Sequence, residues 1–538
     1  MKKDQFLVTI LIVASLLITY YCQQEGIFNK YMIHDDATQY LPAAYALQPG
    51  PLHKALLDDD LIVKYMVLKD SPGHLYLYYL WGLLFDPLLL IKLLPFLLCA
   101  LTTVCFFYFG KAIKNSTTGF FAALIFSFYL WTSKFGFLSG GLPKAFIFPL
   151  FLLFLVFLVN KKHLGCFFIL ILQVLFYPGI AIISLLVYFL DLCDKRRPTI
   201  KEVFKFILVL TSCFILTQLI YRRPDVFLGD LISYREMIKM PEFYMGGRDY
   251  LFCGSLKDFL YSEDASGISV STIFPYLMLL FLISAFYLRK IFSYVPRVLF
   301  YILFSGLSVF LAAWLFLFYL FFPGRYLEYT LPIFLISVIA LAIEKLSAQL
   351  KSTLPERFVL GTIFITIVLF FIPFLQKNLT DYQRPYFEFL KTLPEETLLA
   401  GHPFEMDPIL TFAKRRVLVQ FEVSTAWYKN YYEKIKERTN DFFKAYYSAS
   451  LPELEYFFRK YGINYLIVYK GHFKEGYLSQ GDFYLKPFNG EIKNIVSKNY
   501  GKFVLNSETI HDYKIYEDND FFVISNINCL KPAEARSP

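Results

Sequence analysis

The sequence predicts an α-helical membrane protein with several spans, followed by a soluble α/β domain. Three observations favour this fold class. The chain of 538 residues is 57% hydrophobic, whereas soluble domains are roughly 45–50% apolar. Apolar runs close to the ~20 residues needed to cross a bilayer recur up to about residue 374. Beyond that point charges of both signs mix evenly, and helical segments alternate with short strands.

The first apolar run resembles a signal peptide, because Lys2 and Lys3 precede an apolar core that extends to Tyr21. A cleavage site needs small residues after that core, and the following "YYCQQEG" does not provide them. We therefore interpret the run as a retained first span in the cell membrane, with the N-terminus in the cytoplasm.

Basic residues between the apolar runs predict the orientation, because short cytoplasmic loops are rich in Lys and Arg. When these loops are placed inside, the chain has about eleven spans and its C-terminal part lies outside. The run 164–190 lies between two basic clusters, so we expect two short spans that turn outside at Tyr177-Pro178-Gly179. The loops expected inside contain Lys111, Lys162, Arg196, Lys290 and Lys351.

Two domains are predicted. A membrane domain covers residues 1–376 and contains two long external segments, 23–72 and 221–269. At the end of the first, "SPGHLYLYYLWGLLF" (71–85) follows; it is short and aromatic, which is typical of an interfacial helix.

The second domain, 377–538, is expected outside the cell. Its strands are predicted at 397–401, 416–421 and 463–469, with a long helix over 425–447 and capped helix starts at Asp407-Pro408 and at "SLPE", 450–453. This alternation predicts a small α/β domain with a parallel core. His402 follows the first strand, where open sheets often bind ligands, and we interpret it as a structural loop histidine.

An acidic pair lies just beyond the first span, in "YMIHDDATQYLPAAYAL" (31–47). Asp35 and Asp36 are predicted outside, near the membrane interface and at the start of a helix. One interpretation is that they cap this helix, because aspartate is favoured there and interacts well with the helix dipole. The other interpretation is catalytic, and it comes from a resemblance.

The order of elements resembles the GT-C glycosyltransferase superfamily. Its members include lipid A aminoarabinose transferases, protein mannosyltransferases and oligosaccharyltransferase catalytic subunits. "KDSPGHLYLYYL" (69–80) is similar to the superfamily's "hPPLyy" segment, and "GGLPKAFIFPL" (140–150) is similar to its second external loop as that loop enters a span. The external soluble tail also fits. The resemblance covers the order of elements over most of the chain and uses short motifs.

The resemblance implies an inverting glycosyltransferase in a bacterial or archaeal envelope. The donor would be a sugar on a polyprenyl-phosphate carrier, and the acceptor a glycan, lipid or protein on the external face, with no nucleic acid involved. The acceptor hydroxyl needs a base, which a nearby carboxylate supplies. Asp35 is the favoured base because the superfamily's carboxylate comes first in the pair; Asp36 would then cap or orient.

The carrier phosphate needs cationic or donor partners. The external candidates are Arg325, Arg248, Lys144 and His74. Arg325 is preferred because it lies in a turn where the superfamily often has a basic residue, and we expect it close to the acidic pair. The alternatives are a headgroup anchor for Arg325, an ordinary loop turn for Arg248 and a polar surface position for His74.

A metal is possible but not favoured. Metal-dependent members carry an acidic residue in the second external loop, whereas "SKFGFLSGGLPKAF" (133–146) has lysines and no carboxylate. A divalent ion would need Asp35, Asp36 and distant groups such as Glu242 or Asp249. No zinc motif of the CxxC or HExxH type occurs. We expect no cofactor besides the donor.

Two other functions remain open. The chain could be a non-catalytic envelope protein that keeps the fold as an assembly or lipid-binding subunit. It could also be a transporter, but transporters carry ionisable residues or broken helices at mid-membrane. Here the predicted spans are nearly free of charge and polar residues gather at the external edge, which favours a site at that edge.

Overall fold

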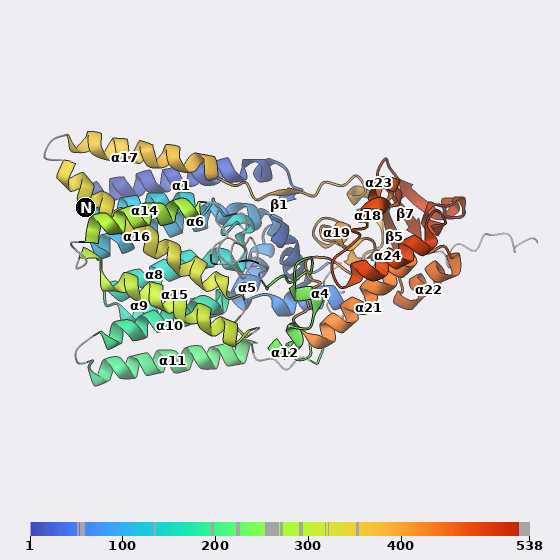
Figure 1. The fold of residues 1–538 in the computed structure, drawn as a ribbon, viewed down its shortest axis with the longest axis horizontal. Coiled ribbons are helices and arrows are strands. Elements are labelled where there is room, and N and C mark those ends of the chain that lie inside the picture. Colours follow the sequence, from blue (N-terminus) through green and yellow to red (C-terminus); the bar gives the residue numbers. More distant parts are fainter. Residues whose placement is uncertain are drawn as a thin grey trace, which may run out of the picture.

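The computed structural model has a bundle of apolar helices at one end and the C-terminal α/β domain at the other (Figure 1). The external segments lie between these two parts, where the two domains meet. The described residues are 2–50, 53, 60–133, 136–194, 198–221, 226–252, 255, 268, 273–289, 294–317, 319–320, 322–350 and 355–526.

Five helices are long and apolar enough to cross a membrane, among the residues that the structure describes: α1 (Lys2–Phe28), α6 (Pro87–Ile113), α11 (Ile200–Tyr221), α15 (Arg297–Leu315) and α16 (Gly324–Leu350). Shorter apolar helices complete the bundle: α7 (Ser116–Tyr129), α8 (Ile147–Val159), α9 (His163–Phe176), α10 (Pro178–Cys193), α14 (Phe274–Leu288) and α17 (Glu356–Phe371). The protein is therefore a membrane protein, and the number of about eleven spans stays a prediction. The expected break in the run 164–190 is present, because α9 ends and α10 begins on either side of Tyr177.

Two glycines bring α6 and α7 into backbone contact. A Cβ atom on Gly119 would lie 2.3 Å from the carbonyl oxygen of Phe107, and one on Gly110 would lie 2.6 Å from the Cα of Gly119. Small residues allow such close approach between helices in a membrane, where packing replaces the hydrophobic effect as the main attraction. The contact fixes α6, whose other end borders the site described below.

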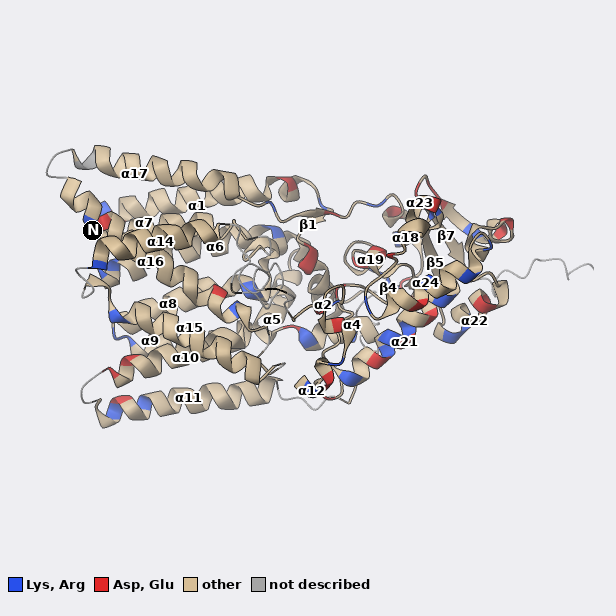
Figure 2. Ribbon diagram, viewed as in Figure 1, with Lys and Arg blue, Asp and Glu red and all other residues tan. Residues whose placement is uncertain are grey.

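Charged residues are sparse along the bundle and gather at its two ends (Figure 2). Lys92 lies near the start of α6 and Glu328 near the start of α16. Lys111 lies in the last turn of α6 and Lys162 directly precedes α9, and their cytoplasmic side stays a prediction. The predicted inner positions Arg196, Lys290 and Lys351 lie outside the described residues.

Cysteine labelling in intact cells tests the orientation. We expect Lys162→Cys, at an exposed position on the far end of the bundle, to resist an impermeant maleimide until the membrane is opened. Glu508→Cys, at an exposed position on the C-terminal domain, should react at once. Immediate labelling of Lys162→Cys from outside would reverse the orientation.

The first external segment contains α2 (Leu41–Ala46) and α4 (Leu61–Lys69). The predicted interfacial helix follows it as α5 (Pro72–Gly82). A two-residue strand before the acidic pair, β1 (Met32–Ile33), pairs antiparallel with β2 (Thr380–Asp381). The chain between α17 and the C-terminal domain is therefore joined to the first external segment. The second segment is described over 226–252 and contains α12 (Tyr234–Met237).

The C-terminal domain is built on a five-stranded sheet in the order β4-β3-β5-β7-β6. Its strands are β3 (Leu398–Ala400), β4 (Arg416–Val417), β5 (Tyr465–Tyr469), β6 (Lys514–Glu517) and β7 (Phe521–Ser525). Strands β4, β3 and β5 are parallel, as predicted, whereas β7 and β6 are antiparallel. The sheet is consequently mixed, with an antiparallel pair at one edge.

The helices of this domain differ from the prediction mainly at their ends. The long aromatic helix is α21 (Lys429–Tyr446), and α22 (Leu451–Tyr461) begins at "SLPE". The predicted capping box at Ser450 is wrong, because Ser450 makes no side-chain cap and Glu453 accepts a hydrogen bond from the Ser448 hydroxyl instead. Further helices are α18 (Phe387–Thr392), α19 (Pro403–Met406), α20 (Ile409–Phe412), α23 (Glu475–Gln480) and α24 (Phe488–Asn499).

Two buried histidines lie side by side at the carboxyl ends of β3 and β5. The rings of His402 and His472 have centroids 4.5 Å apart, and both rings pack among aromatic side chains. Burial lowers the pKa of His402 to about 4 and that of His472 to about 2. His402 packs as a structural residue here, in agreement with the interpretation of the sequence.

These histidines predict a loss of stability in mild acid. The unfolded chain takes up protons below pH 6.5 and the folded domain does not, so stability falls as the pH drops below that value. Between pH 7.5 and 5 the loss should be about 2 kcal/mol per histidine. Thermal unfolding of the full-length protein in detergent measures it. His402→Phe should weaken the pH dependence, and His511→Gln, at an exposed position, should leave it unchanged.

Candidate functional site

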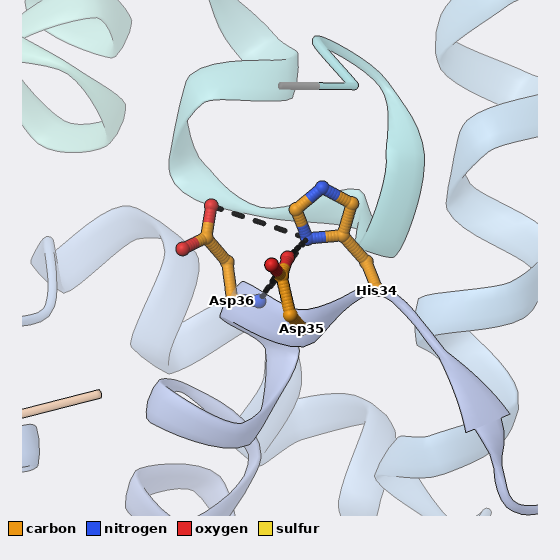
Figure 3. A group of neighbouring side chains, drawn as sticks. All are labelled: His34, Asp35 and Asp36. Atoms are coloured by element: carbon orange, nitrogen blue, oxygen red, sulfur yellow. Dashed lines mark hydrogen bonds and ion pairs between the residues drawn. The ribbon is translucent and has the colours of Figure 1, made fainter. Parts of the chain in front are cut away.

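The acidic pair lies in a short 3-10 helix between the two domains. After β1, His34 caps this helix, and η1 (Asp35–Gln39) follows with both aspartates in its first turn (Figure 3). Neither aspartate is the cap residue itself, so the simple capping interpretation does not describe this geometry. The side chain of Asp35 is 57% exposed and that of Asp36 is 33% exposed, whereas His34 is buried.

His34 holds Asp35. Its Nδ1 atom lies 2.9 Å from Oδ1 of Asp35 and 3.2 Å from the backbone nitrogen of Asp36. These two contacts need different tautomers: a bare Nδ1 accepts from the Asp36 N–H and caps the helix, whereas an Nδ1 that carries the proton donates to the Asp35 carboxylate. Burial alone would raise the pKa of Asp35, but the hydrogen bond and charge of His34 outweigh it and lower the pKa. Asp35 is therefore ionised at neutral pH.

Lys144 and Gln39 hold Asp36. The Lys144 ammonium lies 2.7 Å from Oδ2 of Asp36, and the Gln39 amide donates to Oδ1 at 3.0 Å. Burial would raise the pKa of Asp36, but Lys144 and His34 outweigh that effect and lower it. Both carboxylate oxygens of Asp36 are thus engaged, which distinguishes it from the more exposed Asp35.

The second external loop reaches the pair because of two glycines. Gly140 and Gly141 have φ angles of 76° and 55°, values that L side chains rarely adopt. A Cβ atom on Gly140 would lie 3.1 Å from the Cβ of His34, and one on Gly141 would lie 2.7 Å from the Cβ of Leu94. The loop therefore passes directly against His34 before it delivers Lys144.

A second polar group extends from Gln39 toward the C-terminal domain. Glu422, in the loop after β4, accepts from the Gln39 amide at 2.5 Å, and Lys69 at the end of α4 donates to the Gln39 carbonyl at 2.6 Å. Arg248 pairs with Glu422 at 2.9 Å and also donates to the carbonyl oxygen of Phe421. Burial lowers the pKa of Lys69 to about 8, although Asp36 opposes that shift.

Tyr40 and Arg325 are the next polar residues to consider, and Tyr40 directly follows η1. Burial raises the pKa of Tyr40 above its usual value; Asp70 and Asp36 add to the rise and Arg325 opposes it. Arg325 itself stacks on Phe322 at 4.5 Å and is half-buried at the start of α16.

The predicted phosphate-binding residues thus take different positions. Lys144 contacts the acidic pair directly, and Arg248 reaches it through Glu422 and Gln39. Arg325 stacks on Phe322, and its closeness to the pair stays a prediction. His74 is 1% exposed, so the expectation of a polar surface position is wrong. Its Nδ1 lies 2.8 Å from Asp70, and its ring lies against Tyr40.

Sequence reasoning missed three residues of this site, namely Gln39, Lys69 and Glu422. Lys69 directly precedes the "DSPGHLYL" motif, and a lysine beside a motif on the external side was an available signal. Gln39 and Glu422 gave no signal, because their significance comes from a contact across 383 positions of the chain.

The residues His34, Asp35 and Asp36 could offer ligand atoms to a metal, since these atoms lie within 4.8 Å of one another. The fit is poor, because Lys144 already supplies positive charge to Asp36 at 2.7 Å. The more distant candidate ligands are engaged elsewhere: Glu242 accepts from the Tyr432 hydroxyl, and Asp249 accepts from the backbone nitrogen of Ala426. Neither belongs to this group among the described residues.

Comparison with known proteins finds likeness in structure only. No model of a protein family matches the chain. No curated protein matches it either. The oligosaccharyltransferase of Archaeoglobus fulgidus in its apo form aligns with a TM-score of 0.55 and 11% identity, over 93% of this chain and 72% of the other. Its complex with Zn and sulfate gives 0.52 and 12% over 89% and 70%.

A third solved structure, the archaeal oligosaccharyltransferase AglB from the same organism with an inhibitory peptide and a dolichol-phosphate, gives 0.54 and 10% over 89% and 71%. The chain therefore has the GT-C fold of these enzymes, as the resemblance in sequence predicted. At this identity the likeness defines the arrangement of the elements, and the chemistry has to come from the site.

Proposed function

We propose that this chain with a GT-C fold is a membrane glycosyltransferase that moves a sugar from a polyprenyl-phosphate carrier to an acceptor at the external face of the membrane. One observation carries the proposal. Asp35 and Asp36 lie between the bundle and the C-terminal domain, with the Lys144 ammonium 2.7 Å from the Asp36 carboxylate and the Lys69 ammonium 2.6 Å from the carbonyl oxygen of Gln39. This arrangement supports a base that acts beside cations able to bind a phosphate.

Asp35 acts as the base in this proposal. Its exposed carboxylate accepts the proton of the acceptor hydroxyl while that oxygen forms a bond to the anomeric carbon of the sugar. The bond from this carbon to the carrier phosphate breaks, and its electrons leave with the phosphate. Attack from the face opposite the leaving group inverts the anomeric configuration. Asp36 orients the loop through its contacts to Lys144 and Gln39.

The cations serve the phosphate. Arg325, with the Tyr177 and Tyr329 hydroxyls 2.9 Å from each other nearby, would bind the carrier phosphate and its developing charge. Lys144 and Lys69 add positive charge on the side of the acidic pair. This set supports a polyprenyl-phosphate donor, and the solved complex of AglB with a dolichol-phosphate supports a lipid-phosphate carrier on this fold.

We propose that the site works without a metal. The Lys144 ammonium on Asp36 supplies the charge compensation that a divalent cation would otherwise give. The acceptor is a glycan, lipid or protein; AglB was solved with an inhibitory peptide, which favours including peptides among the acceptors tested.

Incubation of the purified protein with labelled polyprenyl-phosphate sugars tests the function. We expect carrier-dependent transfer or hydrolysis for at least one sugar, undiminished by EDTA. Loss of activity with EDTA and its recovery with a divalent cation would overturn the metal-independent site while leaving the transferase in place. If no sugar of the panel were transferred or hydrolysed in the presence of acceptor lipids and peptides, the result would favour the non-catalytic envelope subunit.

A further inference from the structure

Gln39 occupies a fully determined position between the two domains. Its amide nitrogen donates to Asp36 at 3.0 Å and to Glu422 at 2.5 Å, and its carbonyl oxygen accepts from Lys69 at 2.6 Å. A flipped amide would set its oxygen against two carboxylates and its nitrogen against an ammonium, so only one orientation is stable. The side chain is 6% exposed.

Glu422 is fixed just as firmly from its own side. Arg248 donates to its carboxylate at 2.9 Å and to its backbone carbonyl at 2.9 Å, while Asp407 accepts from its backbone nitrogen at 3.0 Å. Its side chain is 12% exposed. The Glu422 side chain therefore has a single position when the C-terminal domain packs against the second external segment (221–269).

We infer that Gln39 and Glu422 are positioning residues through which the C-terminal domain orients the acidic pair. The inference rests on the proposed function, because the group oriented is the carboxylate pair of that reaction. Glu422 holds the Gln39 amide, Gln39 holds Asp36, and the turn that contains Asp36 carries Asp35. Without the C-terminal domain, one carboxylate partner of Gln39 would be absent.

The geometry explains why the link acts on turnover. Asp36 has one oxygen on Lys144, from the bundle, and the other on Gln39. If Gln39 loses Glu422, only Lys69 and Asp36 still hold its amide, so the amide and the Asp36 carboxylate can shift together about the Lys144 contact. The turn then no longer holds Asp35 in one place, and a misplacement of about 1 Å at a reacting group costs roughly 10²-fold in rate.

Kinetics of four variants test this inference. Gln39→Met keeps length and removes every polar contact, and Glu422→Ala removes the anchor; each should lower kcat roughly 10- to 100-fold and change the donor KM by less than about twofold. The double variant should lose little more than either single one, because both residues belong to one link. Glu422→Gln keeps an acceptor for Gln39 and should retain most of the turnover.

A matched control removes a different contact between the same parts of the molecule. Glu236 in α12 pairs with Lys429 at the start of α21 at 2.7 Å, and its other side-chain contacts go to Ser233, away from the acidic pair. Glu236→Gln should leave kcat unchanged. Equal losses in Glu236→Gln and Glu422→Ala, or additive losses in the Gln39 and Glu422 pair, would mean that these residues only hold the domains together, and the inference would be wrong.

Hydrogen exchange separates this inference from the proposed function. The amides of Ala37 and Tyr40 donate to the carbonyl oxygens of His34 and Ala37 within η1. Their exchange should accelerate in Gln39→Met and in Glu422→Ala, and stay at the parental rate in Glu236→Gln. This holds even if the parental protein transfers none of the sugars tested. Parental exchange rates in both site variants would overturn the inference, whatever the enzyme assay shows.

Discussion

Asp35→Asn should abolish most sugar transfer. The change keeps the size of the side chain and its contact to the Asp36 backbone but removes its capacity to take a proton. Turnover should therefore fall by roughly 10²–10⁴-fold, the range expected for loss of a general base. The donor KM should change little, because the lost interaction develops only in the transition state.

Asp36→Asn is the matched comparison. Asp36 has a salt bridge to Lys144 and an amide on its other oxygen, so its replacement should loosen the loop and lower the rate less. Initial rates with a saturating labelled donor measure both. If the order were reversed, Asp36 would be the base. If both variants transferred sugar at the parental rate, the pair would only begin a helix.

Arg325→Met should weaken donor use. Methionine fits the same half-buried position and has no charge for a phosphate. A hydrogen bond to a charged group contributes about 1.5–3 kcal/mol, so the donor KM should rise roughly 10- to 100-fold. Competition by the free polyprenyl phosphate measures the same loss without turnover.

Two further variants distinguish the alternatives for Arg325. A headgroup anchor does not contact the donor. Under that interpretation Arg325→Lys and Arg325→Met would both keep the parental donor KM. Arg289→Met is the control, since Arg289 also stacks on a neighbouring aromatic ring, Phe286 at 3.8 Å, at the end of α14. It should leave donor binding unchanged.

The architecture was largely predictable because its signals are local. Apolar runs, the proline after Tyr177 and the aromatic stretch before Asp86 each define an element through nearby residues. The antiparallel strands β6 and β7 were not predicted. Strand β7 (Phe521–Ser525) pairs with β5, which lies about fifty residues earlier in the sequence.

The site was predictable only in part, for the same reason. Lys144 was found because its loop motif resembles a known segment, and it does contact Asp36. Arg248 was assigned to the donor phosphate, whereas its guanidinium is held by Glu422, 174 positions away. Composition and spacing do not encode such a partner. The contact of Gln39 with Glu422 likewise arises only when the two domains pack together.

The short pairing of β1 with β2 has a consequence for how the molecule can be divided. Gln376 donates to the carbonyl of Trp131 and Tyr382 donates to that of Tyr31, on either side of the β1–β2 register. The segment 376–382 thus lies alongside the strand that leads to the acidic pair, although by composition it belongs to the C-terminal domain. Proteolytic cleavage or a chain split within residues 376–382 would separate β2 from β1 while the C-terminal domain was still bound. Only a break beyond Tyr382 would release the tail and leave that strand in place.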